Sequence, residues 1–322
     1  MGGIQRAKQR RLPVVEHAIS SRVSTAPGQS LRVLTWNIAF AYGRGSEGWG
    51  YDPRTRRETL ERLRQISEVI RDARADLVFL QEVDFECRRS HRIHQARVLR
   101  ELLDFPFLAE AESWKANYVP YPYWPLRRHF GRMRSGSAVL SRYPIKSHLL
   151  ETLPKARSAS VVHRAFSPFR YYQKIEVEFQ KRATVWANVH LEAYDAEART
   201  QQAAILAGRI TQERWDGMAG DFNALPALET ERGPFLEPYP DDYRGDQTSK
   251  LMELWTTEGW KDVSGDLIAS EKWKTFPTPR SDRRLDYIFV REERAKVREA
   301  RVITEAGGIS DHFPIIADLE WS

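Results

Sequence analysis

Side chains suited to metal binding or proton transfer follow or open six apolar segments of this sequence. The segments TWN, LVFLQE, NVHLE, MAGDFN, RLDYIFV and SDHFPI supply Asn37, Glu82, His190, Asp221, Asn223, Asp286, Asp311 and His312. Carboxylates and amide carbonyls are hard oxygen donors that suit Mg²⁺ or Mn²⁺. Histidines can hydrogen-bond phosphate oxygens or transfer a proton, and a carboxylate behind a histidine fixes its tautomer. This combination predicts metal-assisted hydrolysis of a phosphate ester.

Each of these residues has a simpler explanation when it is taken alone. Asn37 is of a type that commonly forms turns, and Asp286 has Arg283 and Arg284 nearby as surface ion-pair partners. A single histidine in an alternating strand, such as His190, is more often a hydrogen-bonded core or surface residue. Polar side chains at the ends of several strands converge in α/β sheets, however, so the coincidence of eight such residues favours one shared site.

The remaining hydrophobic pattern alternates between helix-like and strand-like segments, which is typical of α/β proteins. Apolar residues recur at helical spacing within 56–73, and an apolar run follows at 77–80. Segments 171–179 and 183–191 alternate strongly and flank a short polar link, which predicts a β-hairpin. Hairpins mixed with helical crossovers predict mixed sheets. Further helices are expected at 94–104, 196–213 and 248–258, and further strands at 31–40, 137–143, 216–221, 285–290, 297–303 and 312–320.

Seven short motifs occur in order along the chain, namely WN, QE, SGSAVLSRYPI, NVHLE, GDFN, RLDYIFV and SDHFPI. In this order and at domain-scale spacing, they resemble the motif series of the endonuclease/exonuclease/phosphatase superfamily, the fold of deoxyribonuclease I, exonuclease III and neutral sphingomyelinase. The resemblance covers about residues 31–321. It implies an α/β fold, a four-layer sandwich in which two mixed β-sheets pack face to face and helices lie outside.

The resemblance also implies roles for the residues at the strand ends. Glu82 corresponds to the principal carboxylate ligand of the metal, with Asn37 beside it and Asp311 as a further ligand on the metal side. The implied cofactor is Mg²⁺, with Mn²⁺ as a substitute, and members of the superfamily are argued to use one metal or two.

Five further residues correspond to catalytic positions of the superfamily. Asp221 matches the residue that orients or deprotonates the attacking water, and Asn223 matches the amide that stabilises the transition state. His312 matches the histidine that contacts the scissile phosphate, with Asp286 as its paired carboxylate. His190 matches the second histidine of the deoxyribonuclease and sphingomyelinase branches.

Two segments rich in proline, aromatic and charged residues, 105–135 and 224–247, are expected to be long loops, and such loops are usually functional. Aromatic residues among prolines at 117–125 suit stacking on unpaired bases, insertion into a lipid interface, or packing as a lid over a smaller phosphate compound. Basic residues follow at 127–134 and recur between 155 and 174, as a basic rim for a polyanion or as ordinary solvated loops. The residues that we expect to bind substrate are Tyr121, Trp124, Arg132, Arg134 and Arg170.

Composition and charge narrow the class of protein. The 322 residues are 41% hydrophobic and 29% charged, which indicates a globular chain. Residues 1–30 hold five basic residues against one acidic residue, so most of the net charge of +6 lies in this segment. We expect 1–30 to be a basic, flexible tail and 31–322 to be one catalytic domain. A single cysteine, Cys87, and the absence of a visible signal or membrane span favour the cytoplasm.

The predicted function is metal-dependent hydrolysis of a phosphate ester, with DNA or RNA favoured as substrate. A phospholipid, a sugar phosphate or an inositol phosphate is the alternative within this class, and membrane contact stays open. No obligate protein partner is evident. A non-catalytic nucleic-acid-binding module is the alternative of another class, because a fold does not guarantee an activity. Such a module is expected to lose metal and histidine positions, and all of them are present here.

Overall fold

The computed structural model describes residues 8–16, 30–42, 55–121, 124, 126, 129–155, 168–226, 243, 246–265 and 271–321. The helices are α1 (Arg56–Asp72), α2 (Gln95–Leu103), α4 (Ala196–Gln212) and α5 (Thr248–Thr257), with 3₁₀ turns η1 (Ala39–Ala41), η4 (Glu271–Trp273) and η5 (Thr304–Ile309). The expected helices at 56–73, 94–104, 196–213 and 248–258 are therefore confirmed. Across the described ranges, no helix is both long enough and apolar enough to span a membrane.

The strands form two seven-stranded sheets. The first sheet has the order β1 (Lys8–Arg11), β7 (Ile145–Thr152), β8 (Tyr171–Phe179), β9 (Arg182–His190), β10 (Gly217–Asp221), β12 (Asp286–Arg291) and β11 (Trp260–Asp262). The second has the order β13 (Ala295–Val302), β14 (Ile315–Trp321), β3 (Leu31–Asn37), β4 (Leu77–Asp84), β6 (Gly131–Ser141), β5 (Phe107–Val119) and β2 (Val14–Glu16).

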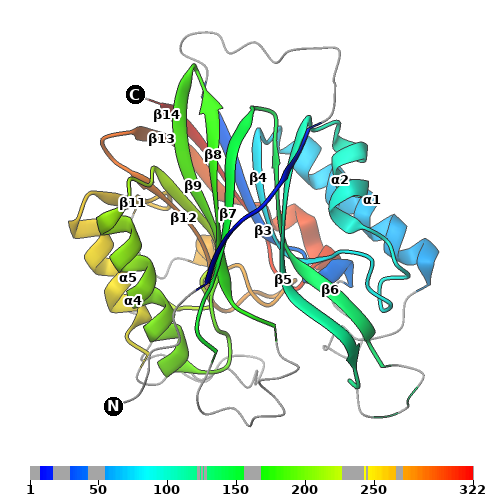
Figure 1. Cartoon of the computed structure of the whole chain (residues 1–322). Coiled ribbons are helices and arrows are strands. Elements are labelled where there is room, and N and C mark those ends of the chain that lie inside the picture. Colours follow the sequence, from blue (N-terminus) through cyan, green and yellow to red (C-terminus); the bar gives the residue numbers. More distant parts are fainter. Residues whose placement is uncertain are drawn as a thin grey trace.

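Both sheets are mixed, and helices cover their outer faces. The pairs β9–β10 and β3–β4 are parallel, whereas every other pair is antiparallel. Helices α4 and α5 lie on one outer side and α1 and α2 on the other, with the two sheets between them (Figure 1). A core of buried residues from both sheets fills the space between the layers. The predicted four-layer sandwich is confirmed.

The N-terminal segment differs from the expected flexible tail over residues 8–16. Strand β1 pairs antiparallel with β7, and β2 pairs antiparallel with β5 in the other sheet. Leu12, between them, packs against Leu150 and Tyr171. The segment therefore crosses from one sheet to the other, as the dark blue ribbon shows in Figure 1. β1 is short, basic and exposed, and β2 has only three residues, so neither shows the apolar alternation from which strands are predicted. The rest of the tail lies outside the described residues.

The segment 105–135 also differs from the expectation, because most of it forms two strands rather than a loop. Strands β5 and β6 pair over most of their length, with two irregularities in the register. Buried and partly exposed residues alternate along much of β5, as they do in a strand that is covered on one face. The charged residues of β5 gave the segment a loop-like composition, but Glu110 pairs with Arg97 of α2 and Glu112 pairs with Arg134 of β6. The second expected loop, 224–247, lies mostly outside the described residues.

Candidate active site

The ends of three neighbouring strands in the first sheet bring His190, Asp221 and Asp286 side by side. Asp221 at the end of β10 is the register partner of His190 at the end of β9. Asp221 is also the register partner of Asp286, which opens the antiparallel strand β12. Adjacent strands are about 5 Å apart, so three side chains that are 31 and 65 positions apart in sequence become neighbours. The predicted convergence of these three residues is thus present.

The second sheet contributes from the other side of the sandwich. Asn37 ends β3, and its side-chain Nδ2 donates a hydrogen bond to Oδ2 of Asp221 over 3.0 Å. Both residues are almost fully buried. Ser310 fixes the same corner, since its hydroxyl donates to the carbonyl of Asn37 over 2.7 Å. The site therefore lies at the seam where the two sheets meet at their strand ends.

A β-bulge positions Glu82. The pairing of β4 with β6 shifts between Leu80 and Val83, so two residues of β4 oppose one residue of β6. Glu82 has φ = 55°, an uncommon conformation for a side-chain-bearing residue. Bulges often re-aim a side chain next to an active site. Because of the bulge, Glu82 reaches the His190 imidazole, with 3.9 Å between Oε1 and Nε2.

The turn after β10 holds Asp221 and Asn223 in place. Gly220 precedes Asp221, and a Cβ on this glycine would lie 2.0 Å from the carbonyl oxygen of Val189, so no other residue fits the close approach of β10 to β9. The backbone amide of Asn223 donates to Oδ1 of Asp221 over 2.9 Å. Asn223 has φ = 49°, which asparagine tolerates well, and its side chain donates to the carbonyl of Leu191.

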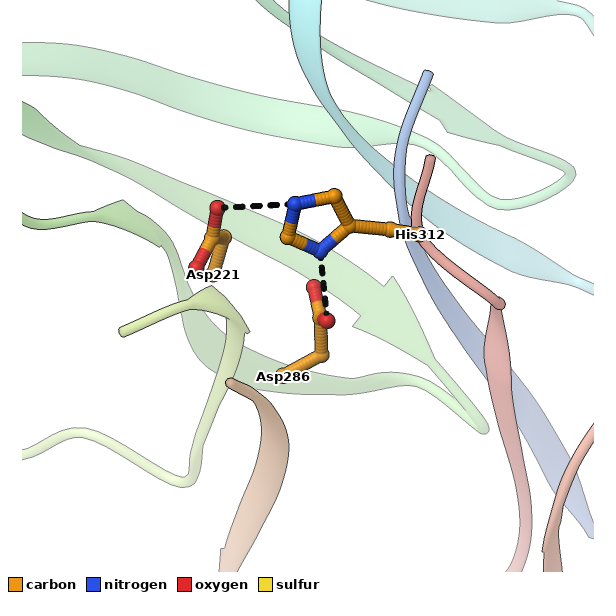
Figure 2. Close-up of side chains that lie close together, drawn as sticks. All are labelled: Asp221, Asp286 and His312. Atoms are coloured by element: carbon orange, nitrogen blue, oxygen red, sulfur yellow. Dashed lines mark hydrogen bonds and ion pairs between the residues drawn. The ribbon is translucent and has the colours of Figure 1, made fainter. Parts of the chain in front are cut away.

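His312 is held between two carboxylates, as Figure 2 shows. Its Nδ1 lies 2.8 Å from Oδ2 of Asp286, and its Nε2 lies 3.8 Å from Oδ2 of Asp221. Burial by itself would lower the pKa of His312, but Asp286 and Asp221 together raise that pKa well above its ordinary value. The predicted pairing of His312 with Asp286 is present, and the raised pKa of His312 favours the imidazolium form.

His190 has the opposite environment. Nη1 of the buried Arg170 lies 2.6 Å from Nε2 of His190, and a guanidinium can only donate. His190 Nε2 is therefore an acceptor, and the ring is neutral with its proton on Nδ1. Burial and then the positive charge of Arg170 hold the pKa of His190 well below its ordinary value. The contact of 3.6 Å between His190 and Asp221 is for this reason not an ion pair.

The carboxylates of the site fit a divalent cation. Burial and the negative charge of Asp311 raise the pKa of Glu82 to about 7. Burial, partly opposed by His312, raises the pKa of Asp221 to about 6. Oδ1 of Asp286 is buried without a hydrogen-bond partner among the described residues. Crowded, partly protonated carboxylates and an unsatisfied oxygen are the environment that a hard cation stabilises.

Two sets of residues are able to hold this cation. Glu82, Asn37 and Asp311 are the set that the sequence predicts, and the negative charge of Asp311 acts on Glu82. Ligand atoms of Asp221, Asp286 and His312 also lie within 4.8 Å of one another. Nδ1 of His312 bonds to Asp286, and Oδ1 of Asn37 accepts the backbone amide of Ala39, so carboxylate oxygens are the main donors that either set offers.

The five predicted substrate-binding residues occupy two different places. Arg170 lies inside the site, beside His190. Tyr121 and Trp124 belong to the connection between β5 and β6, where Trp124 is 78% exposed and the Tyr121 ring packs edge-on against Phe130. Arg132 and Arg134 lie on β6. Arg132 is exposed, but Arg134 pairs with Glu112 at 2.6 Å and with Glu86 at 3.3 Å. These two carboxylates weaken the attraction of Arg134 for a negatively charged substrate. The other basic residues expected in this connection, Arg127 and Arg128, lie outside the described residues.

The segment that carries Asp311 and His312 is not the start of a strand. β14 begins at Ile315, and both residues lie in the bend before it. The indole of Trp36 donates to the carbonyl of His312, and the backbone amide of His312 donates to Ser310. Trp36 and Ser310 therefore position His312, and sequence reasoning missed both. The serine of SDHFPI and the tryptophan of TWN stand next to singled-out residues, which was the available signal.

Comparison with known protein families assigns this chain to one family. Residues 34–312 match the model of the Endonuclease/Exonuclease/phosphatase family. Because the match spans most of the sequence, the chain belongs to this family, whose members are metal-dependent phosphoesterases. A comparison of the sequence with curated proteins finds no significant match.

Three solved structures show the same fold at low sequence identity. An endonuclease/exonuclease/phosphatase from Beutenbergia cavernae has 22% identity and a TM-score of 0.61, covering 91% of this chain and 72% of the other. The human Nocturnin catalytic domain with bound sulfate has 20% identity and a TM-score of 0.57, covering 97% of each chain. A mannosyl-6-phosphatase from Bacteroides thetaiotaomicron has 16% identity and a TM-score of 0.56, covering 90% of this chain and 99% of the other. These similarities concern the fold and leave the substrate of this chain open.

Proposed function

We propose that this chain hydrolyses a phosphodiester of nucleic acid with Mg²⁺, or with Mn²⁺ in its place. The observation that carries the proposal is the pair of cationic groups on either side of Asp221. The imidazolium of His312 lies 3.8 Å from this carboxylate, and the positive charge of Arg170, beside His190, also acts on it. Positive groups around one carboxylate suit a phosphate that is attacked by water.

The side chains divide the chemistry between them. Asp221 accepts a proton from the attacking water or orients it, since its carboxylate becomes ionised above about pH 6. His312 donates a hydrogen bond from Nε2 to a phosphoryl oxygen, while Asp286 holds its Nδ1. Asn223 is placed by its own turn to donate to the phosphate in the transition state.

Glu82, Asn37 and Asp311 would hold the metal ion. When bound, the ion neutralises phosphate charge and lowers the pKa of coordinated water. Arg170 supplies the fixed positive charge on the side of His190, because His190 itself is neutral and accepts from the guanidinium. We therefore propose that Arg170 binds the phosphate on this side and that His190 holds Arg170 in position.

Nucleic acid is favoured by exposed aromatic and basic side chains near the β5–β6 connection. Tyr121, Trp124 and Arg132 combine a stacking surface with a positive charge. The exposure of Trp124 and Leu126, at 78% and 60%, supports a phospholipid as the second candidate, since such side chains also enter lipid interfaces. The lone, buried Cys87 fits a reducing compartment such as the cytoplasm.

The test is hydrolysis of bis-p-nitrophenyl phosphate, DNA, RNA, sphingomyelin and inositol phosphates by the full chain with Mg²⁺ or Mn²⁺. We expect metal-dependent cleavage of a nucleic acid and its loss in Glu82→Ala and in His312→Ala. Glu320→Gln, at an exposed ion pair with Arg298, is the matched control and is expected to stay active. Full metal-dependent activity in both active-site variants would contradict the proposed roles. Nucleic-acid binding without turnover would instead support the non-catalytic module.

A further inference from the structure

Two exposed aromatic side chains flank the buried Arg170. Phe169 directly precedes Arg170 and is 43% exposed, and Tyr194 follows the end of β9 and is 54% exposed. Tyr194 lies close enough to Arg170 to influence its pKa, which burial lowers and the charges of Glu192 and Tyr194 raise. Both rings are therefore exposed in part and lie next to the buried guanidinium, where they are accessible to a ligand of the site.

A basic residue and a carboxylate connect these two rings. Nζ of Lys155 lies over the Phe169 ring, 4.1 Å from its centroid. Glu192 lies 3.5 Å from Nε of Arg170, and its Oε1 accepts the backbone amide of Tyr194 over 3.2 Å. Glu192 also acts on the pKa of Lys155, which burial lowers. These pairwise contacts link Phe169, Lys155, Glu192 and Tyr194 to the surroundings of Arg170, which itself contacts His190.

The strand-end loop that presents Tyr194 is held from inside the protein. Arg199, in the first turn of α4, is fully buried and donates from Nη1 to the carbonyls of Glu192 and Ala193 over 2.7 and 2.9 Å. Its Nε donates to Asp246 over 2.7 Å. The backbone of Phe169 is tied in turn to the carbonyl of Ser113 on β5. Both rings thus project from anchored backbone, so little ordering is needed when a ligand binds.

We propose that Phe169 and Tyr194 form a stacking platform for the base next to the scissile phosphate, with Lys155 contacting the neighbouring phosphate. This inference rests on the proposed function and deepens it, since it selects single-stranded nucleic acid among the phosphate esters. Bases of single strands expose both faces and stack on aromatic rings, whereas a sugar phosphate offers no such face. A cation beside the rings suits the phosphate that follows in such a strand.

The experiment compares two substrates, a hexamer of deoxythymidylate and the same hexamer with abasic sites beside the cleaved bond. For Phe169→Ala/Tyr194→Ala, we expect KM for the first substrate to rise about tenfold, because the two rings together stack one base and the stacking of one base contributes about that factor. Its kcat should stay within about twofold, and KM for the abasic hexamer should not change. Phe169→Tyr and Tyr194→Phe, which keep the rings, should restore KM.

Two further variants sharpen the result. Leu254→Ala, an exposed residue on α5, should change neither constant. Lys155→Gln should reduce the slope of log affinity against log salt by about 0.7, as expected for one phosphate contact on a single strand. An equal loss on both hexamers, or the tenfold effect in Trp124→Ala in place of the double variant, would overturn the platform.

Binding measured by fluorescence anisotropy in EDTA separates this inference from the proposed function. One outcome is that the labelled hexamer binds in EDTA with an affinity that depends on both rings, while the assays with Mg²⁺ or Mn²⁺ show no cleavage of any phosphate ester. In that case the platform stands and the hydrolytic function is wrong. If the protein cleaves a phospholipid or a sugar phosphate and does not bind the hexamer, the hydrolytic function stands and the platform is wrong.

Discussion

The two histidines of the site lie on either side of one carboxylate and have opposite charge states. His312 and His190 approach Oδ2 of Asp221 to 3.8 and 3.6 Å. His312 has Asp286 behind it and is positively charged, whereas His190 has Arg170 against it and is neutral. The partner of each ring decides its protonation, because both rings are equally buried. The same residue type therefore serves as cation on one side and as acceptor for a cation on the other.

The largest expected effect follows from breaking the His312 side. Asp286→Asn keeps the shape of the partner but removes its charge, so the pKa of His312 should fall and kcat should drop by about 100-fold. Histidine titration by NMR and the kinetics of diester hydrolysis measure the two effects. Unchanged titration of His312 would contradict its assignment as an imidazolium held by Asp286. Glu320→Gln is the control for loss of a carboxylate at an exposed ion pair.

Breaking the His190 side is expected to have a smaller effect. In Arg170→Gln, the cation that opposes protonation is lost, so the pKa of His190 should rise and kcat/KM should fall by about tenfold to 100-fold. Arg170→Lys keeps the charge and should recover part of the activity. The titration of His312 should stay nearly the same in both variants. A simultaneous shift of both histidines would show that the two sides do not act separately.

Metal binding should depend on pH in the direction set by Glu82 and Asp221. Their pKa values of about 7 and about 6 mean that protons compete with the metal below neutrality. We expect the Mn²⁺ affinity measured by calorimetry to be at least about tenfold higher at pH 8 than at pH 5.5. In Glu82→Gln most of this pH dependence should disappear. An affinity independent of pH in the unaltered protein would argue against a carboxylate site.

The metal-free protein should show the matching trend in its stability. Glu82 and Asp221 bind protons more tightly when folded than when unfolded, since both pKa values are raised. The stability that they contribute is present below about pH 4 and is lost as pH rises through about 6 and 7. We therefore expect Mg²⁺, when it is added to the metal-free chain, to stabilise the protein most above pH 7. Thermal unfolding with and without Mg²⁺ measures this effect. A larger effect at pH 5 would contradict the raised pKa values.

The smallest expected effect comes from the N-terminal segment. Leu12 packs against Tyr171, whose ring stands edge-on to His190 at 6.0 Å between centroids. Leu12→Ala should lower the free energy of unfolding by about 1 kcal/mol, because the side chain is only partly buried. Urea denaturation measures this loss. The NMR signals of His190 should shift in this variant while those of His312 should not, and the reverse pattern would contradict the packing.

The sequence predicted most of the architecture because its long elements carry clear periodicity. The hairpin of β8 and β9 alternates apolar and polar residues, and α1 shows helical spacing with a capping box between Thr55 and Glu58. Strands β1 and β2 were missed because three or four residues are too few to show such a pattern. The positive charge of residues 1–30 suggested a segment exposed to solvent. A strand at the edge of a sheet, however, pairs through its backbone groups, so charged side chains do not prevent the pairing.

The candidate site was predictable in its membership but not in its charges. Asn37, Asp221 and His312 stand out because a polar residue at the end of an apolar run is unusual, and their contacts follow from strand order. The approach of Arg170 to His190 joins residues 20 positions apart through the β8–β9 hairpin. Its distance of 2.6 Å depends on how the two side chains pack, which a linear pattern does not carry.

The residue pattern alone predicted an α/β chain with mixed sheets and polar side chains at its strand ends, and the ordered motifs added the resemblance to a family that folds as a two-sheet sandwich. Hydrophobic periodicity is a property of one segment, so it can be recognised without knowing which other segments pack against it. Only the tertiary structure decided which histidine is charged, how the bulge aims Glu82, and that Tyr194 lies near Arg170. These features depend on electrostatic and packing contacts between distant segments, whose energies are set by distance and burial in the folded chain.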